Sequence, residues 1–201
     1  MTVKAPARNE RVADAPVDRL FLDRWSPRAF SPEPIAGETL RTLFEAARWA
    51  PSCFNEQPWV FIYSGTEEDR LRILDVLTER NQVWAKNAPV LALLFARRTF
   101  RKTGRPNRWA AFDCGAAWMS LTVQARFLGL YTHAMAGYRR DRAYQAAGIP
   151  EEEYEVICAI AIGRYGDPED LPGEIRASEF PKDRKPLAEV AVAGQWPEGR
   201  V

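Results

Sequence analysis

Two long apolar runs constrain the fold more than any other feature of this 201-residue sequence. Residues 89–96 read PVLALLFA and residues 154–162 read YEVICAIAI. Because neither run alternates regularly between apolar and polar side chains, each predicts a strand buried on both of its faces. The β-branched and aromatic run 59–63 (WVFIY) predicts another strand, and a short extended piece is expected within residues 132–137.

Helical patterns occupy much of the sequence between these strands. Within residues 38–49, apolar side chains recur at i, i+3, i+4 and i+7, which predicts a helix with one buried stripe. Residues 109–129 predict a long central helix whose small residues would let another helix or a subunit approach closely. Thr66 is suited to cap a helix that buries Leu71, Leu74 and Leu77. The expected helices are therefore 17–23, 38–49, 66–80, 109–129 and 141–148.

The composition is that of an ordinary soluble domain. The chain is 46% hydrophobic and 27% charged, and its formal net charge of +1 favours neither nucleic acid nor a membrane surface. We expect a mobile N-terminal arm over residues 1–15 and a single domain over residues 16–201. Three scattered cysteines without a C-x-x-C pair, and no signal-peptide pattern, favour a reducing, cytoplasmic location.

The segment 24–34 contains three prolines and therefore cannot form the interior of a helix. In an extended chain alternate side chains share one side, so Arg24, Ser26 and Arg28 would point the same way. Two guanidinium groups and a hydroxyl form a set of donors that suits a phosphate group. The alternative is a pair of solvated surface arginines.

A polar loop is expected between the helix 38–49 and the strand 59–63. Prolines bracket this loop at both ends, and three of its side chains could hydrogen-bond a planar polar ligand: Ser52, Asn55 and Gln57. The alternative is an ordinary connection between a helix and a strand.

Several kinds of active site are not supported by the sequence. Its one histidine, His133, is too few for a histidine-rich metal site. It also lacks the glycine-rich loop that binds phosphate in nucleotide-binding proteins. Cys53 and His133 could be drawn as a nucleophile and a base, but nothing in the sequence orients that pair. The remaining polar residues are donors and cations, which is typical of a site where a cofactor carries the chemistry. They are Arg24, Ser26, Arg28, Ser52, Asn55, Gln57, Asn81, Lys182 and Arg184.

These segments, taken in order, resemble the flavin-dependent nitroreductase family. The resemblance rests first on R-x-S-x-R-x-F at residues 24–30 and APS-x-x-N-x-QPW at residues 50–59. Three further segments follow in the family's order: NQ-x-W-x-x-x-AP at 81–89, TH-x-M-x-G at 132–137 and RKPL at 184–187. The arginine-rich segment 97–107 lies where family members differ and could form a substrate lid, although a solvated loop is the simpler interpretation.

The resemblance implies an α+β fold with a central, mostly antiparallel sheet flanked by helices. It also implies an intertwined homodimer with two FMN molecules at the subunit interface. Arg24, Ser26 and Arg28 would meet the phosphate and ribityl end of FMN, and Lys182 and Arg184 would add charge at the phosphate.

The same resemblance assigns residues to the flavin ring. Asn81 would reach the pyrimidine edge, and the backbone from Met135 to Gly137 would cover the far side of the ring. The loop residues Ser52, Asn55 and Gln57 would line the flavin that is anchored mainly by the partner subunit.

The implied activity is that of an FMN-dependent oxidoreductase working by ping-pong. NAD(P)H would give a hydride to the flavin, which would then reduce a small-molecule acceptor such as a nitroaromatic, a quinone or an activated alkene. His133 would be a proton donor or, as we favour, a structural residue. The alternatives are a flavin storage or sensor protein without efficient turnover, and a reductive dehalogenase or flavin-degrading relative on the same fold.

Overall fold

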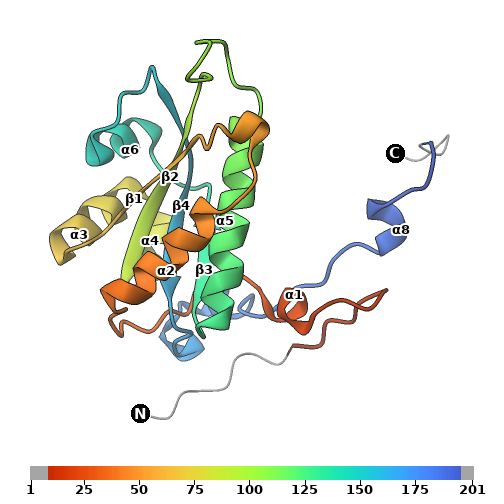
Figure 1. Cartoon of the computed structure of the whole chain (residues 1–201). Coiled ribbons are helices and arrows are strands. Elements are labelled where there is room, and N and C mark those ends of the chain that lie inside the picture. The colour runs from red at the N-terminus through yellow and green to blue at the C-terminus, as the bar shows by residue number, and fades with distance from the viewer. Residues whose placement is uncertain (1–8, 196–201) are drawn as a thin grey trace.

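A four-stranded antiparallel sheet forms the centre of the molecule (Figure 1). The computed structural model describes residues 9–195. The strand order is β1-β2-β4-β3, and every neighbouring pair is antiparallel. The strands are β1 (Trp59–Tyr63), β2 (Val90–Arg97), β3 (Tyr131–Met135) and β4 (Tyr154–Gly163). This confirms the expected α+β fold with an antiparallel sheet flanked by helices.

The helices of the described chain are α1 (Arg19–Asp23), α2 (Gly37–Arg48), α3 (Glu67–Val76), α4 (Glu79–Ala85), α5 (Ala110–Phe127), α6 (Arg140–Ala147), α7 (Gly173–Arg176) and α8 (Leu187–Val190). Helices α2 to α6 pack against the two faces of this sheet, whereas α1 and α8 lie away from it (Figure 1). Two short 3-10 turns, Cys53–Asn55 and Pro168–Asp170, complete the regular structure of the described chain. None of the helices in residues 9–195 is long and apolar enough to span a bilayer.

The side chains of β2 divide between two hydrophobic cores. Leu91, Leu93 and Phe95 pack with residues of α3, α4 and α6. Their neighbours in sequence, such as Leu94, point to the opposite face and pack with residues of α2 and α5, including Leu43. Burial on both faces is the physical reason for the unbroken apolar runs in the sequence.

The long helix α5 has one face of small residues and another of large aromatic ones. Ala117, Cys114 and Ala125 are fully buried against the sheet and α2. On its outward side Phe112 and Phe127 are 75% and 69% exposed. Exposed aromatic side chains of this size are unusual on a monomer and are typical of an interaction surface.

The helix expected over residues 66–80 is interrupted at Leu77. Thr66 caps α3 through the predicted side-chain bond to the Asp69 N–H, at 3.1 Å. Leu77, however, is extended and forms a bridge to Tyr138, so the chain leaves helical geometry before α4 begins. Within α3 the buried residues are Ile73 and Val76, so Leu71 is 51% exposed, which contradicts its expected inward position. The tertiary contact of Leu77 outweighs local helix propensity here.

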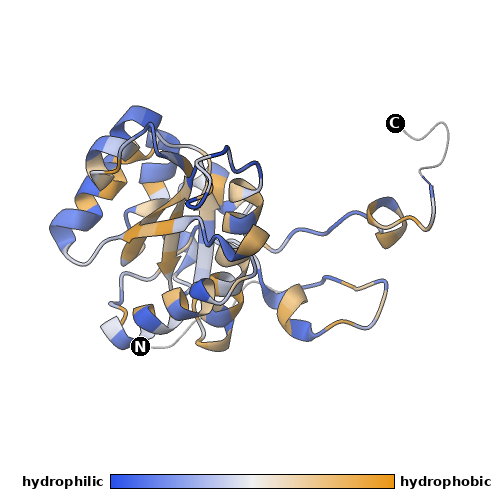
Figure 2. Ribbon diagram, turned by 45° about the horizontal axis from the view of Figure 1, so that its top comes forward, coloured by the Kyte–Doolittle hydropathy of each residue, from blue (hydrophilic) through white to orange (hydrophobic). Residues whose placement is uncertain are grey.

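Segments at both ends of the described chain project from the body of the molecule. Figure 2 shows hydrophobic residues along α1 and α8, and Val190 on α8 is 70% exposed. The expected mobile arm, residues 1–15, lies partly outside the described residues. Its described part is held by hydrogen bonds: the Asn9 side-chain amide donates to Leu22 O at 2.9 Å, and the Leu187 N–H donates to the Asp14 carboxylate at 2.6 Å.

The proline-containing segment 24–34 is extended, as predicted, and docks beyond the end of β4. The Gly166 N–H donates to Ala29 O at 2.8 Å, and the Ser31 N–H donates to Arg164 O at 3.0 Å. Trp25, Pro27 and Ala29 are buried, whereas Ser26 and Arg28 between them are half-buried, in the alternation expected for an extended chain. This docking fixes where the R-x-S-x-R side chains lie.

Gly166 lies in close contact with the backbone of the docked segment 24–34. A Cβ at residue 166 would lie 2.5 Å from the backbone carbon of Phe30, so Gly166→Ala forces the two backbones apart. We expect the substitution to lower the free energy of unfolding by about 2 kcal/mol, as overpacking does. The control is Gly173→Ala, where a Cβ meets nothing within 4 Å. Chemical denaturation measures both, and equal stability of the two variants would contradict the prediction.

Candidate functional site

Arginines from two distant segments gather at the base of the projecting arms. Arg24 and Arg184 line one pocket of about 720 Å³, together with Arg11. Arg24 is half-buried, and its guanidinium lies 3.5 Å from the Ser26 hydroxyl oxygen, so the expected shared side is observed. Burial lowers the pKa of Arg24, and the positive charges of Arg184 and Arg11 lower it further. Across residues 9–195 no ion pair neutralises Arg24 or Arg184. Such a group of cations is suited to an anion with several oxygens.

Lys182 joins this cluster through its backbone. Its carbonyl oxygen accepts hydrogen bonds from Arg11 Nε at 2.8 Å and from Arg184 Nη1 at 3.0 Å. The residue itself is exposed. The structure therefore places the predicted residues Arg24, Ser26, Lys182 and Arg184 in one neighbourhood.

A second pocket, of about 800 Å³, lies where β3 meets α4 and α7. It brings together four residues that the sequence analysis had assigned to one ligand: Arg28, Asn81, Met135 and Gly137. Three residues of extended chain lie between Arg24 and Arg28, so the Cα atoms of these two residues, one from each pocket, are at most about 14 Å apart. An elongated ligand with an anionic end and a planar end would fit this arrangement.

Gly137 is a close-contact position in the lining of the second pocket. Its carbonyl oxygen accepts hydrogen bonds from the Asn81 amide at 3.0 Å and from the Thr78 hydroxyl at 3.2 Å. A Cβ at residue 137 would lie 2.6 Å from the Asn81 amide nitrogen, so any larger residue would displace Asn81. This bond uses one of the two N–H donors of the Asn81 amide, so the amide oxygen can accept from a ligand and the second N–H can donate to one.

Buried Glu179 holds the backbone that carries Arg28. One of its carboxylate oxygens accepts from the Arg28 N–H at 2.7 Å and from the Ala29 N–H at 2.8 Å. Burial raises the pKa of Glu179, whereas the two backbone bonds and the Arg28 charge oppose the rise. The sequence analysis missed this residue because no local pattern links it to a segment 150 positions earlier.

His133 is packed into the structure beside the second pocket. Its Nδ1 lies 2.8 Å from Pro27 O, and its ring is 4.7 Å from the Trp84 ring. Burial lowers the pKa of His133 from 6.5 to about 4, so the ring is neutral near pH 7 and Nδ1–H donates to Pro27 O. The geometry thus supports the structural role and gives no support to a proton donor at neutral pH.

The polar loop 52–57 lies at the other end of the sheet. The Arg97 N–H at the end of β2 donates to Pro58 O, whereas the segment 24–34 docks beyond the opposite end of the sheet. The length of β2 separates these ends by about 23 Å, at roughly 3.3 Å per residue. Within one chain the loop therefore cannot line the pockets of Arg24 and Arg28. Cys53 and His133 are kept apart in the same way, so one chain does not form that dyad.

The loop 52–57 is also strained. Phe54, Asn55 and Gln57 have φ values of 53°, 56° and 51°, a region that costs on the order of 1 kcal/mol for most residues. Hydrogen bonds hold the loop in place: the Gln57 N–H donates to the Ser52 hydroxyl at 3.0 Å, and the Cys53 N–H donates to buried Asp113 at 3.2 Å. Strain of this kind is common where a loop serves a ligand or a partner.

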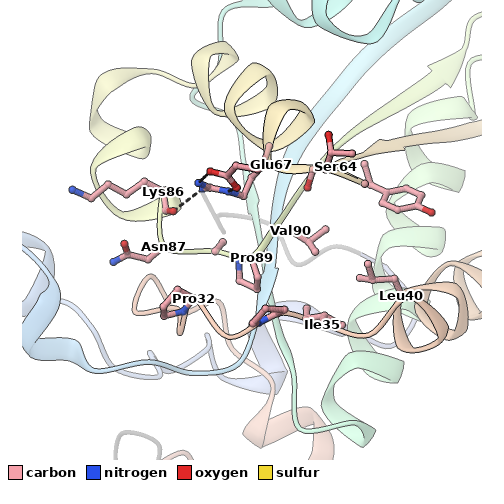
Figure 3. Close-up of a pocket in the computed structure, with 16 residues that line it drawn as sticks. Pro32, Ile35, Leu40, Ser64, Glu67, Lys86, Asn87, Pro89 and Val90 are labelled. Carbon is pink, nitrogen blue, oxygen red and sulfur yellow. Dashed lines mark hydrogen bonds and ion pairs between the residues drawn. The ribbon is translucent and has the colours of Figure 1, made fainter.

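A third pocket, of about 570 Å³, lies between the segment 32–37 and the start of α3 (Figure 3). Its charged residues are Glu67, Arg70 and Lys86, and Arg70 forms an ion pair with Glu67 and donates to Lys86 O at 2.7 Å. The positive charge of Arg70 is therefore already balanced. Prolines and aliphatic residues form much of the remaining wall, so this pocket is a poor match for a phosphorylated ligand.

The chain belongs to the nitroreductase family. The model of the Nitroreductase family matches residues 22–83 and 76–164. A Streptomyces coelicolor protein with the provisional name NADH dehydrogenase/NAD(P)H nitroreductase is 36% identical over 175 residues, which covers 74% of this chain and 83% of the relative. The resemblance inferred from the sequence motifs is thus confirmed.

Solved structures share the fold. One, described as an oxidoreductase containing FMN, is 41% identical, with a TM-score of 0.89 over 96% of this chain and 99% of the other. Another, from Exiguobacterium sibiricum, is provisionally named a nitroreductase and was solved with FMN. It is 21% identical, with a TM-score of 0.72 over 94% of this chain and all of the other, and supports the fold alone.

The buried His133 predicts a loss of stability in mild acid. Its folded pKa of about 4 lies below 6.5, so between these values the unfolded chain binds a proton that the folded chain does not. Lowering the pH from 6.5 to 4 should therefore reduce the free energy of unfolding by about 3 kcal/mol from this residue.

The matched variant is His133→Asn, whose side-chain amide can still donate to Pro27 O but does not titrate. Urea denaturation at several pH values should show a shallower dependence for the variant. If the free energy of unfolding depended on pH equally in both proteins, the assignment of a buried, neutral His133 would be contradicted.

Proposed function

We propose that this chain is an NAD(P)H-dependent FMN oxidoreductase. The observation that carries the proposal is the group of half-buried or exposed arginines without carboxylate partners at Arg24 and Arg184, beside the Ser26 hydroxyl. The 41% identical structure described as containing FMN and the relative named NAD(P)H nitroreductase support it. A phosphate dianion would balance charges that this part of the chain leaves unpaired.

The two neighbouring pockets fit the two ends of FMN. Arg24, Ser26 and Arg184 would hold the phosphate, with Lys182 adding positive charge from the surface. Arg28 would lie toward the ribityl chain, between the phosphate and the ring. The position of these donors around the two neighbouring pockets supports the proposed roles.

The flavin ring would lie in the second pocket. The Asn81 amide oxygen, oriented through Gly137 O, would accept a bond from the polar edge of the ring. The backbone from Met135 to Gly137 would face the ring. When bound, FMN supplies the redox chemistry, accepting a hydride from NAD(P)H and reducing an acceptor.

We further propose that the active form is a homodimer with FMN at the interface. Ser52, Asn55 and Gln57 lie too far from Arg24 to serve the same flavin within one chain, so they would line the flavin held by the partner. The exposed aromatic side chains of α5 and the projecting α8 offer apolar surface for such an interface.

Donor and acceptor would use the same site in turn, which gives ping-pong kinetics. The proposed acceptors are nitroaromatics, quinones or activated alkenes. The chain's contribution would be to bind and orient the flavin rather than to donate protons, since His133 is neutral near pH 7.

Anaerobic reduction of the purified protein tests this function. We expect bound FMN to bleach with NADH or NADPH and to regain its colour when a nitroarene is added. Bleaching without recovery on nitroarenes, quinones and alkenes would favour a storage or sensor protein. A protein that takes up no FMN would refute the flavin proposal altogether.

Arg28→Ala should weaken FMN binding by about 2–3 kcal/mol, because a charge-assisted partner of the ligand is lost. Equilibrium dialysis of apoprotein against FMN measures this change. The control is Arg142→Ala, since Arg142 forms an exposed ion pair with Asp75 between α6 and α3 and lines neither pocket. Equal FMN affinity in the two variants would reject a role for Arg28 in binding.

A further inference from the structure

Arg11 connects three segments of the chain at the base of the arms. Its Nε donates to Lys182 O at 2.8 Å, and its Nη1 donates to both Leu22 O and Arg24 O at 2.9 Å. It thereby joins the N-terminal arm, the start of the R-x-S-x-R segment and the C-terminal tail, which lies 171 positions away.

The carbonyl oxygen of Lys182 is the meeting point of two guanidinium groups. Arg11 Nε and Arg184 Nη1 both donate to it. Through its other bonds Arg11 also fixes the backbone of Arg24. Three arginines from three segments therefore converge on one pocket.

Burial and mutual repulsion disfavour this convergence, although the same pocket is also lined by the carboxylates of Glu10, Asp14 and Asp183. Burial lowers the pKa of Arg11, and the nearby Arg184 lowers it further, against the opposing charges of Asp183 and Asp23. Hydrogen bonds to backbone carbonyls hold Arg11 in place but supply no counter-charge. The repulsion is relieved when a multiply charged oxyanion enters the pocket.

We propose that Arg11 is a positioning residue for the phosphate group of the flavin: by holding residues 22–24 against residues 182–184, it sets Arg24 and Arg184 around a single anion. This role rests on the proposed function. It makes the N-terminal arm part of the cofactor site and gives the protein a means of preferring a phosphorylated flavin to an unphosphorylated one.

The role requires the geometry of arginine. The planar guanidinium donates in several fixed directions at once, so one side chain can bond carbonyls from separate segments. A lysine ammonium at residue 11 would retain the charge but would lack this fork, and we expect it to recover only part of the effect.

Binding of FMN and riboflavin to the apoprotein tests the proposal, because riboflavin lacks only the phosphate. Dissociation constants follow from the quenching of flavin fluorescence. Arg11→Ala should weaken FMN binding by about tenfold or more and riboflavin by less than about twofold, since charge-assisted contacts to the phosphate carry the difference. The FMN affinity of Arg11→Lys should lie between that of the alanine variant and that of the wild type.

The matched control is Arg19→Ala. Arg19 lies on the neighbouring α1 and is 70% exposed, and its recorded partner is Asp23. This variant should keep the wild-type ratio of the two dissociation constants. Circular dichroism checks folding, and if Arg11→Ala does not fold, Arg11→Lys carries the test.

The outcomes separate this role from the proposed function. An unchanged ratio in the folded Arg11 variants, or an equal loss of FMN and riboflavin binding, would overturn the positioning role. An equal loss of FMN and riboflavin binding would mean that the substitution disturbs the structure in general rather than the contacts to the phosphate. If the wild-type protein binds FMN no more tightly than riboflavin, the phosphate anchor itself fails, and this role fails with it.

Discussion

Burial of β2 and β4 on both faces is the constraint on which the rest of the structure depends. These two central strands are apolar along their length, so helices must cover both sides of the sheet. α2 and α5 cover one side and α3, α4 and α6 the other. The sheet then fixes the distance between two segments, because the segment 24–34 docks at one end of it and the loop 52–57 lies at the other.

Unpaired positive charges distinguish the end of the sheet where the segment 24–34 docks. Most arginines in the described chain pair with nearby carboxylates, as Arg70 does with Glu67. Arg24, Arg28 and Arg184 do not: Arg24 and Arg184 line one pocket, and Arg28 lines the neighbouring one. A nitroreductase-family chain with an unbalanced cation cluster beside an amide-lined pocket is well suited to a ligand that is anionic at one end and planar at the other.

Because the loop 52–57 and the arginine cluster lie at opposite ends of the sheet, flavin binding would be linked to dimer formation. The strained loop 52–57 and the arginine cluster are each well ordered by their own hydrogen bonds, yet one chain cannot bring them together. A site shared between two copies would use both, and would also cover the aromatic residues that α5 exposes. Under that proposal, the cost of holding Phe54 and Gln57 at positive φ is offset by contacts that form in the dimer.

The sequence by itself determined the strands, most helices and the residue types of the site, because apolar periodicity and the R-x-S-x-R alternation act over a few residues. Only the tertiary structure decided the break at Leu77, the neutral state of His133 and the contacts of Arg11 and Glu179. Those outcomes depend on contacts between segments up to 171 positions apart, such as Arg11 with Lys182. No local pattern encodes such a contact, since it exists only once the sheet has fixed where the distant segments meet.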